Sequence, residues 1–276
     1  GQVAALMHAD YRDHDALARF ASQGDFATFD FENVPADSAH WLAERIPVYP
    51  NPRALAVAQD RLAEKTLFQS LGIGTPAFRA VDTLAALRAA VSEIGVPSIL
   101  KTRRLGYDGK GQYRLRNVED VDAACPALSG GRDSASLILD GFVRFQRELS
   151  VVAVRSRSGE FRHWPLTRNW HHEGVLSLSL APAAVSDSTT AEALGYAKSV
   201  ADQLDYVGVF ALELFEVDGR LLANEMAPRV HNSGHWTIEG AECSQFENHL
   251  RAVMGLPLGE TAARGHSSML NWIGDL

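Results

Sequence analysis

Residues 101–112 read KTRRLGYDGKGQ and lie between two apolar segments, residues 96–100 and 113–115. The glycines and lysines that set the chemistry of this stretch are Gly106, Gly109, Gly111, Lys101 and Lys110. Glycine permits close backbone approaches that a side chain would block, and successive N–H groups in such a loop form a concave site for anionic oxygen. The stretch predicts a strand, a phosphate-binding flap and a second strand, with an ordinary hairpin turn as the alternative.

The glycine spacing distinguishes this loop from two common nucleotide motifs. It does not follow G-x-x-x-x-G-K-[ST], and no helix clearly follows it. The stretch is therefore neither a P-loop nor a Rossmann turn.

Length, net charge and cysteine content limit the classes of protein to which the chain can belong. A chain of 276 residues favours about two domains. Its formal net charge of −8 argues against a nonspecific nucleic-acid binder, which would carry a basic footprint. Apolar runs stay well short of the roughly 18 residues that span a bilayer. Cys125 and Cys243 are isolated, so we expect two small core residues in a reduced, cytoplasmic protein.

Both ends of the chain resemble the interior of a protein. It begins without Met, and it stops directly after the strand-like segment SSMLNWI. We therefore expect a fragment of a longer protein.

Periodicity and capping residues predict an alternation of helices and strands. Helices are expected over residues 13–21, 51–71, 82–94, 117–126, 186–204 and 237–254. Strands are expected over residues 26–31, 76–81, 97–103, 113–116, 136–143, 148–155, 161–166, 175–180, 207–217 and 221–226. The strand over 148–155 alternates as a half-buried strand does.

Three polar features of these elements leave alternatives open. Glu32 follows a predicted strand, at the edge where α/β sheets bind ligands, and could equally be a solvated loop acid. Arg61 and Lys65 share one helix face, which a solvated ion-pair ladder explains equally well. Residues 170–172, WHH, suggest a metal site, but a loop is preferred because adjacent histidines rarely both reach one ion.

Two glutamates lie on one predicted hairpin around Asp218 and Gly219. Glu213 is in the middle of an apolar strand, where a carboxylate is costly unless it is paired or metal-bound. Glu225 lies on the return strand. A two-residue turn would set Glu213 opposite Asn224, whereas a longer turn or a bulge would bring both glutamates to one face. The pair is a candidate Mg²⁺ site, and an ion pair of Glu213 with Arg or Lys is the alternative.

The segment after Glu225, residues 226–237, reads MAPRVHNSGHWT and is too polar for a buried strand. Arginine presents a fork to carboxylate or phosphate, so the segment suits a loop that binds an oxyanion. A polar surface loop is the other interpretation.

Taken together, these segments resemble the N5-carboxyaminoimidazole ribonucleotide synthetase family within the ATP-grasp superfamily. The resemblance covers nearly the whole chain and rests on FDFENVP, QDRLAEK, ILKTRRLGYDGKGQ, RELSVV, PLTRNWHHEGVL and NEMAPRVHNSGHWT. The last segment is the most specific, and its combination with GYDGKGQ is much stronger than a glycine motif alone.

The resemblance implies an α/β (α+β) ATP-grasp fold with the remnant of an N-terminal Rossmann-like (preATP-grasp) domain. Its implied domains are the remnant at 1–52, the ATP-grasp domain at 53–256 and the start of a C-terminal domain at 257–276. Within the ATP-grasp domain, a small flap lobe would cover about 75–145 and a large lobe about 146–256.

The resemblance also implies a reaction. ATP phosphorylates bicarbonate to carboxyphosphate, and the amine of 5-aminoimidazole ribonucleotide takes the carboxyl group, with ADP and phosphate released. ATP and Mg²⁺ are the implied cofactors, and a cytoplasmic homodimer that binds neither nucleic acid nor membrane is expected.

Site residues follow by position from the same resemblance. Implied ATP contacts are Arg61, Lys101, Gly106, Tyr107, Asp108, Gly109, Lys110, Gly111, Gln112, Asp140, Gly141, Phe142, Val143, Glu148, His171, Asn224 and Glu225. Among them, residues 140–143 would hold the adenine edge, Glu148 the ribose hydroxyls, and Lys101 the phosphates. Tyr107 and Asp108 are also expected to reach the ribonucleotide. Glu213 and Glu225 would bind Mg²⁺, and the catalytic group that holds bicarbonate or carboxyphosphate would be Arg229, His231, Asn232 and Ser233.

Two departures from the family pattern and two other functions accompany this hypothesis. Many ATP-grasp enzymes have an Asn ligand where this chain has Ala227, and the family's N-terminal glycine loop and C-terminal basic domain lie outside the sequence. We therefore expect Mg-ATP binding with weak ribonucleotide binding.

The alternatives are a sister ligase, such as formate-dependent glycinamide ribonucleotide transformylase, and a nucleotide-binding module without turnover.

Overall fold

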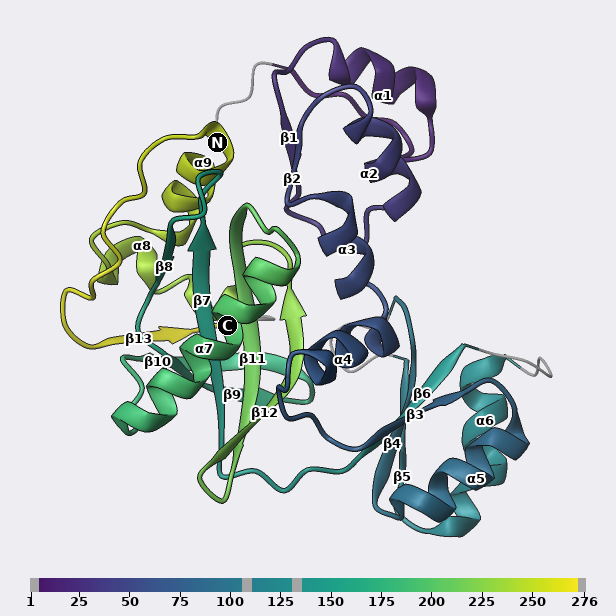
Figure 1. The fold of residues 1–276 in the computed structure, drawn as a ribbon. Helices are drawn as coiled ribbons and strands as arrows, with labels where there is room; N and C mark the ends of the chain where they lie inside the picture. The colour runs from purple at the N-terminus through teal and green to yellow at the C-terminus, as the bar shows by residue number, and fades with distance from the viewer. Residues whose placement is uncertain (1–4, 106–110, 131–135, 273–276) are drawn as a thin grey trace.

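The computed structural model describes residues 5–105, 111–130 and 136–272. Within these ranges the chain forms an N-terminal part, a small lobe and a large lobe, which Figure 1 shows in sequence order from purple to yellow. The predicted Gly106–Lys110 part of the flap lies outside the described residues.

The N-terminal part is a short helical layer on a two-stranded parallel sheet. Its elements are α1 (His14–Ala21), β1 (Ala27–Thr28), α2 (Ala36–Ala43), β2 (Val48–Tyr49) and α3 (Pro52–Ala58). Asp13 caps α1 and Asn51 caps α3, each by accepting a backbone N–H with its side chain. A small apolar core that includes Phe29, Leu42 and Leu55 joins the layers.

The small lobe is an antiparallel sheet in the order β3-β6-β4-β5, packed against two helices. Its elements are β3 (Phe78–Val81), α5 (Leu84–Ile94), β4 (Ser98–Thr102), β5 (Gln112–Leu115), η1 (Val118–Asp120), α6 (Val121–Ser129) and β6 (Leu137–Gly141). Lys101 pairs with Gln112 in the β4–β5 register. The expected strand–loop–strand arrangement around the glycine stretch is therefore confirmed for its two strands.

The large lobe is built on a sheet with the path β12-β11-β7-β9-β10-β13, and β8 also pairs with β7. Its strands are β7 (Arg147–Arg155), β8 (Phe161–His163), β9 (Thr167–His172), β10 (Val175–Ala181), β11 (Gly208–Val217), β12 (Arg220–Ala227) and β13 (Ser267–Leu270). Its helices are α7 (Asp187–Gln203), η2 (Asn232–Gly234), α8 (Thr237–Gly240) and α9 (Gln245–Met254).

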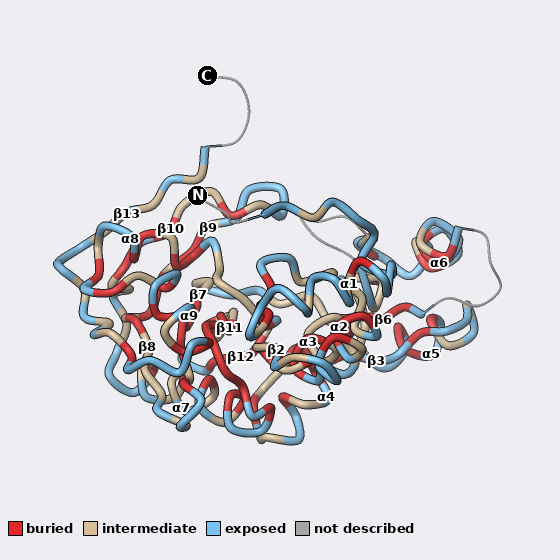
Figure 2. Tube along the Cα trace, turned by 90° about the horizontal axis from the view of Figure 1, so that it is seen from above, coloured by how far each residue is buried: buried red, intermediate tan, exposed pale blue. Residues whose placement is uncertain are grey.

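Helices cover both faces of the large sheet. Leu149 and Val151 of β7 pack with the α7 side, whereas Val152 and Val154 pack with the α8–α9 side. Successive side chains of a strand point to opposite faces, so the two cores lie on the two sides of β7. Figure 2 shows the resulting run of buried residues along β7 and β11.

Helix α4 (Arg61–Ser70) lies between the two lobes (Figure 1). Asp60 caps it by accepting the N–H groups of Leu62 and Ala63. Arg61 N–H donates to the carbonyl of Arg103, 3.0 Å away, just after β4. The N-terminus of α4 is thus fixed against the chain that leads into the glycine loop.

Several sequence-based boundaries are wrong. The helix expected over 51–71 is two helices, because Asp60 starts a new one. The helix expected over 237–254 is interrupted at Ala241, which bridges to Ala263. Pro126 lies inside α6 rather than at its end, since Gly130 supplies the left-handed C-cap.

Two strand assignments also differ. Residues 170–172 belong to β9, so the expected loop is wrong. Residues 149–154 of β7 are buried on both faces, whereas a half-buried strand was expected, because helices cover both sides of the sheet. Both cysteines are free and buried, as expected. Among the described residues, none of the helices has the length and apolar character to cross a membrane.

Candidate functional site

A cavity of about 400 Å³ lies where the two lobes and the N-terminal part meet. Its walls come from β4 and β5, from α4, and from β7, β9, β11 and β12 with the loop that follows. The predicted site residues that line it are Arg61, Lys101, Gly111, Gln112, Glu148, His171, Glu213, Asn224, Glu225, Arg229, His231 and Asn232. Residues far apart in the sequence therefore converge on one cavity.

The two glutamates of the β11–β12 hairpin stand directly opposite each other. Val217 pairs with Arg220 around a two-residue turn, yet Glu213 pairs with Glu225 and Leu214 with Ala223. The shift makes Asn224 the extra residue of a β-bulge. The expected bulge is confirmed, and it places both carboxylates on the face that lines the cavity.

The two carboxyl groups differ electrostatically. Burial tends to raise the pKa of Glu213, but the hydrogen bond from His231, 3.2 Å away, brings this pKa below its usual value. Enclosure at the cavity wall and the like charge of Glu213 raise the pKa of Glu225. Arg61 and Lys101 oppose that rise through their positive charges. The cavity thus holds paired acids next to basic groups.

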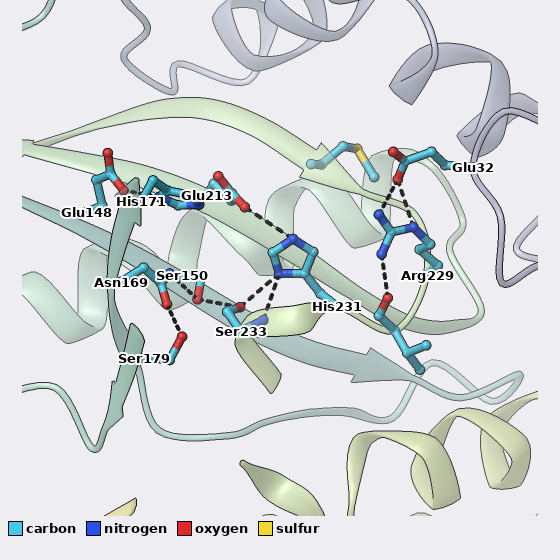
Figure 3. Close-up of polar contacts among 12 residues, drawn as sticks. Glu32, Glu148, Ser150, Asn169, His171, Ser179, Glu213, Arg229, His231 and Ser233 are labelled. Atoms are coloured by element: carbon cyan, nitrogen blue, oxygen red, sulfur yellow. Dashed lines mark hydrogen bonds and ion pairs between the residues drawn. The ribbon is translucent and has the colours of Figure 1, made fainter. Parts of the chain in front are cut away.

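A chain of hydrogen bonds orients His231 from the Nδ1 side of its ring, away from Glu213 (Figure 3). Asn169 donates to Ser150 Oγ at 3.0 Å, and Ser150 donates to Ser233 Oγ at 2.8 Å. Ser233 Oγ in turn lies 2.9 Å from His231 Nδ1. With Nδ1 accepting from Ser233, His231 presents Nε2–H to Glu213.

Ser233 is therefore a supporting residue of this site. It is fully buried and is absent from the residues that line the cavity. Sequence reasoning grouped it with the direct oxyanion contacts, whereas its hydroxyl faces His231 and Ser150.

Glu148 and His171 form a second polar pair at the cavity (Figure 3). Glu148 Oε2 contacts His171 Nδ1, from β7 to the neighbouring strand β9. Partial burial tends to lower the pKa of His171, but the hydrogen bond to Glu148 raises it overall. The histidine is held in place by the acid predicted to bind the ribose.

Arg229 and Glu32 form a third pair, between the loop after β12 and the N-terminal part (Figure 3). Glu32 Oε2 accepts from Arg229 Nε at 2.8 Å and lies 2.7 Å from Nη2. Both residues line the cavity. Glu32 is thus a cavity acid, and the solvated-loop interpretation of it is wrong.

The predicted adenine hinge, Asp140, Gly141, Phe142 and Val143, is not among the residues that line the cavity. Asp140 is instead buried on β6, where its Oδ2 lies 2.9 Å from Lys101 Nζ and 3.6 Å from Lys65 Nζ. In this arrangement Asp140 fixes Lys101, and Lys101 reaches the cavity. Gly106, Tyr107, Asp108, Gly109 and Lys110 lie outside the described residues.

Sequence reasoning missed several residues of the cavity wall. Gln59, Glu64 and Asn169 line it, and Glu64 is almost completely buried. The ion-pair ladder proposed for α4 as a solvated alternative is wrong, because Glu64 and Lys65 both lie in the interior. A signal was present in the pattern, since both charges fall on the helix face that also carries the buried Phe68.

The paired glutamates are chemically suited to Mg²⁺, which takes oxygen ligands and is commonly held by one or two carboxylates plus phosphate oxygens. Among the described residues, groups of three or more His, Cys, Asp or Glu arranged for a metal ion are not found. A two-carboxylate site agrees with both observations, because substrate phosphates and water supply the other ligands of such an ion.

Comparison with known proteins gives a family. Residues 66–246 match the ATP-grasp domain family, and residues 1–59 match the ribonucleotide synthetase preATP-grasp domain family. N5-carboxyaminoimidazole ribonucleotide synthase of Pseudomonas aeruginosa is 55% identical over 97% of this chain and 73% of its own length. The enzyme of the same name from Bacillus subtilis is 41% identical over 100% of this chain and 72% of its own length.

Solved structures agree in fold. The crystal structure of N5-carboxyaminoimidazole ribonucleotide synthetase from Thermus thermophilus has a TM-score of 0.91 and 54% identity, covering 97% of this chain and 72% of the other. The Aspergillus clavatus enzyme, in complex with ADP and 5-aminoimidazole ribonucleotide, has a TM-score of 0.87 at 29% identity, covering 96% and 69%. With its bulged glutamate pair in an interlobe cavity, the chain belongs to the N5-carboxyaminoimidazole ribonucleotide synthase family of ATP-grasp ligases.

Proposed function

We propose that this cavity catalyses the ATP-dependent carboxylation of 5-aminoimidazole ribonucleotide with bicarbonate, a step of purine biosynthesis. A bicarbonate oxygen attacks the γ-phosphorus of ATP, and ADP leaves. The substrate amine then attacks the carboxyl carbon of carboxyphosphate, phosphate leaves, and the nitrogen loses a proton. The products are N5-carboxyaminoimidazole ribonucleotide, ADP and phosphate.

The observation that carries the proposal is the contact between the glutamate pair and the loop after β12. His231 Nε2 lies 3.2 Å from Glu213 Oε1, and Arg229 and Asn232 line the same cavity. A group that binds phosphates and a group that binds a small oxyanion are thus adjacent, as phosphoryl transfer to bicarbonate requires.

Glu213 and Glu225 would hold Mg²⁺. The ion, when bound, would neutralise charge on the phosphate oxygens during transfer. Lys101, fixed by Asp140 at 2.9 Å, adds a positive charge at the phosphate end of the cavity.

The remaining residues position the reactants. Arg229 would bind bicarbonate through its guanidinium, which is already oriented by Glu32. His231 would border the same oxyanion region, with Ser233 holding its ring and its Nε2–H directed at Glu213. Glu148, held by His171, would accept hydrogen bonds from the ribose hydroxyls. Catalysis of this kind consists mainly of positioning and charge neutralisation.

The test is phosphate release from ATP, measured with and without bicarbonate and with and without 5-aminoimidazole ribonucleotide. We expect release that needs bicarbonate and that increases at high concentrations of the ribonucleotide, which this chain is expected to bind weakly. Release that needs formate would indicate the sister ligase instead, and ATP binding without release would indicate a nucleotide-binding module.

The family resemblance also predicts a homodimer and a cytoplasmic location. Both stay predictions, and sedimentation of the purified protein at several concentrations tests the first.

A further inference from the structure

We propose that Glu64 and Lys65 are positioning residues that fix the backbone of β12 on both sides of Glu225. The inference rests on the proposed function in one respect, namely that Glu225 is a metal-binding carboxylate. Its geometry stands on contacts between α4 and β12 alone.

Glu64 holds the peptide group that follows Glu225. Its Oε1 accepts the N–H of Met226 at 2.6 Å, and the side chain is 2% exposed. Burial and the nearby charge of Glu225 raise the pKa of Glu64 well above its usual value. Glu64 therefore supplies a buried hydrogen-bond acceptor for the peptide group next to Glu225.

Lys65 holds the residue that precedes Glu225. Its Nζ lies 3.4 Å from the carbonyl of Asn224, which is the extra residue of the bulge. The side chain is 2% exposed, and Asp140 Oδ2, 3.6 Å away, balances its charge. A buried lysine thus stabilises the irregularity on which the glutamate register depends.

The position of β12 explains why such support is needed. It is the edge strand of the large sheet in the part of the chain that the structure describes, so one side of its backbone lacks a neighbouring strand there. Buried backbone groups require hydrogen-bond partners. Two consecutive residues of α4 supply these partners: Lys65 donates to the carbonyl before Glu225, and Glu64 accepts the N–H after it.

The same helix connects this support to the small lobe. Lys65 shares Asp140 with Lys101, and Arg61 N–H bonds to Arg103 before the glycine loop. Groups around a metal ligand orient it, and their loss typically lowers metal affinity or activity about 10- to 100-fold. We expect α4 to set Glu225 in this way.

Three variants separate this role from simple packing. Glu64→Leu removes the acceptor, Glu64→Gln keeps an acceptor oxygen without charge, and Lys65→Met keeps an unbranched chain without the ammonium. Lys198→Met is the control, because Lys198 is an exposed lysine of α7 whose partner is Asp202. Thermal unfolding establishes which variants are folded.

Two measurements follow on the folded proteins. The first is Mn²⁺ affinity in the presence of ADP, by electron paramagnetic resonance. The second is the exchange rate of the Met226 amide, by NMR. We expect Glu64→Leu and Lys65→Met to bind Mn²⁺ about 10- to 100-fold more weakly, and Glu64→Leu to exchange this amide at least about tenfold faster. Glu64→Gln and Lys198→Met should stay within about twofold of wild type.

Distinct results overturn the inference. Wild-type Mn²⁺ affinity in both Glu64→Leu and Lys65→Met would limit the two residues to structural roles. A loss in Glu64→Gln as large as in Glu64→Leu would contradict the acceptor role. A wild-type protein that binds no Mn²⁺ would refute the metal site itself, and the Met226 exchange rates would still decide whether Glu64 holds the backbone.

Discussion

His231 Nε2 and Glu213 Oε1 lie 3.2 Å apart, so the loop after β12 contacts the glutamate pair directly. The contact joins two groups that the sequence separates by a hairpin and a loop. A change in the loop therefore bears on the position of Glu213, and the following measurements test the site.

Glu225→Gln should abolish ATP turnover. The change keeps the shape of the side chain and removes one of the two carboxylates that face each other across the bulge. We expect a fall in kcat of at least about 100-fold, measured as phosphate release. Near-normal turnover in the folded variant would refute the two-carboxylate site.

Ser233→Ala should slow catalysis while leaving ATP binding unchanged. The hydroxyl holds His231 Nδ1 at 2.9 Å but does not line the cavity. Loss of this orientation should lower kcat about tenfold, with the Kd for ATP within twofold by calorimetry. An equal loss in ATP affinity would show that Ser233 acts on nucleotide binding.

Glu148→Gln should lower the pKa of His171, because the hydrogen bond to Glu148 raises that pKa against the effect of burial. The raised pKa means that the pair stabilises the fold fully below pH 6.5, the unfolded value. This contribution disappears as pH rises through the higher folded value. An NMR titration of the His171 ring measures the shift.

Glu173→Gln is the matched control, since Glu173 is an exposed acid two residues beyond His171. An unchanged His171 pKa in Glu148→Gln, or an equal fall in the control, would contradict the assignment.

His249 should make the protein less stable in acid. Burial lowers its pKa from 6.5 to about 4, with Asp30 opposing the shift. As pH falls below 6.5, the unfolded chain takes up a proton that the folded chain accepts only near pH 4. The free energy of unfolding should therefore fall by roughly 3 kcal/mol over that range.

His249→Gln tests this stability effect. Nδ1 of His249 accepts from Val209 N–H at 3.0 Å, and Nε2 contacts Thr28 Oγ1 at 2.7 Å. Gln offers an acceptor and a donor but does not titrate. The fall in the free energy of unfolding that His249 causes should therefore be absent from this variant, as measured by urea unfolding at each pH. An unchanged slope between pH 6.5 and 4 would exclude His249 as the source.

Much of the fold could be predicted because local signals were strong. Thr83 and Gly95 bracket α5 as capping predicts, and Lys101 pairs with Gln112 around the glycine loop. A longer turn or a bulge was expected on chemical grounds, since a regular two-residue hairpin would have separated the glutamates, and the structure has a bulge at Asn224.

The features of the site that could not be predicted depend on contacts between residues far apart in the sequence. Glu64 and Lys65 share a helix face with the buried Phe68, but only the positions of β12 and Asp140 show which groups they contact in the interior. His171 lies on a strand because β9 pairs with β7 over residues 167–169 and with β10 at His171 itself, opposite Leu176. Local sequence patterns do not predict these pairings. The supporting role of Ser233 could not be predicted, because it depends on a hydrogen bond with Ser150, which lies 83 residues away in the sequence.

The contact between Thr28 and His249 also constrains how the chain can be made. The two residues are 221 positions apart. At about 5–20 residues per second, synthesis reaches His249 roughly 10–40 s after Thr28. During that interval the Thr28 side chain lacks its His249 partner, so this contact forms only after α9 has been synthesised. Within the described residues, α9 near the end of the chain thus contacts β1 near its beginning.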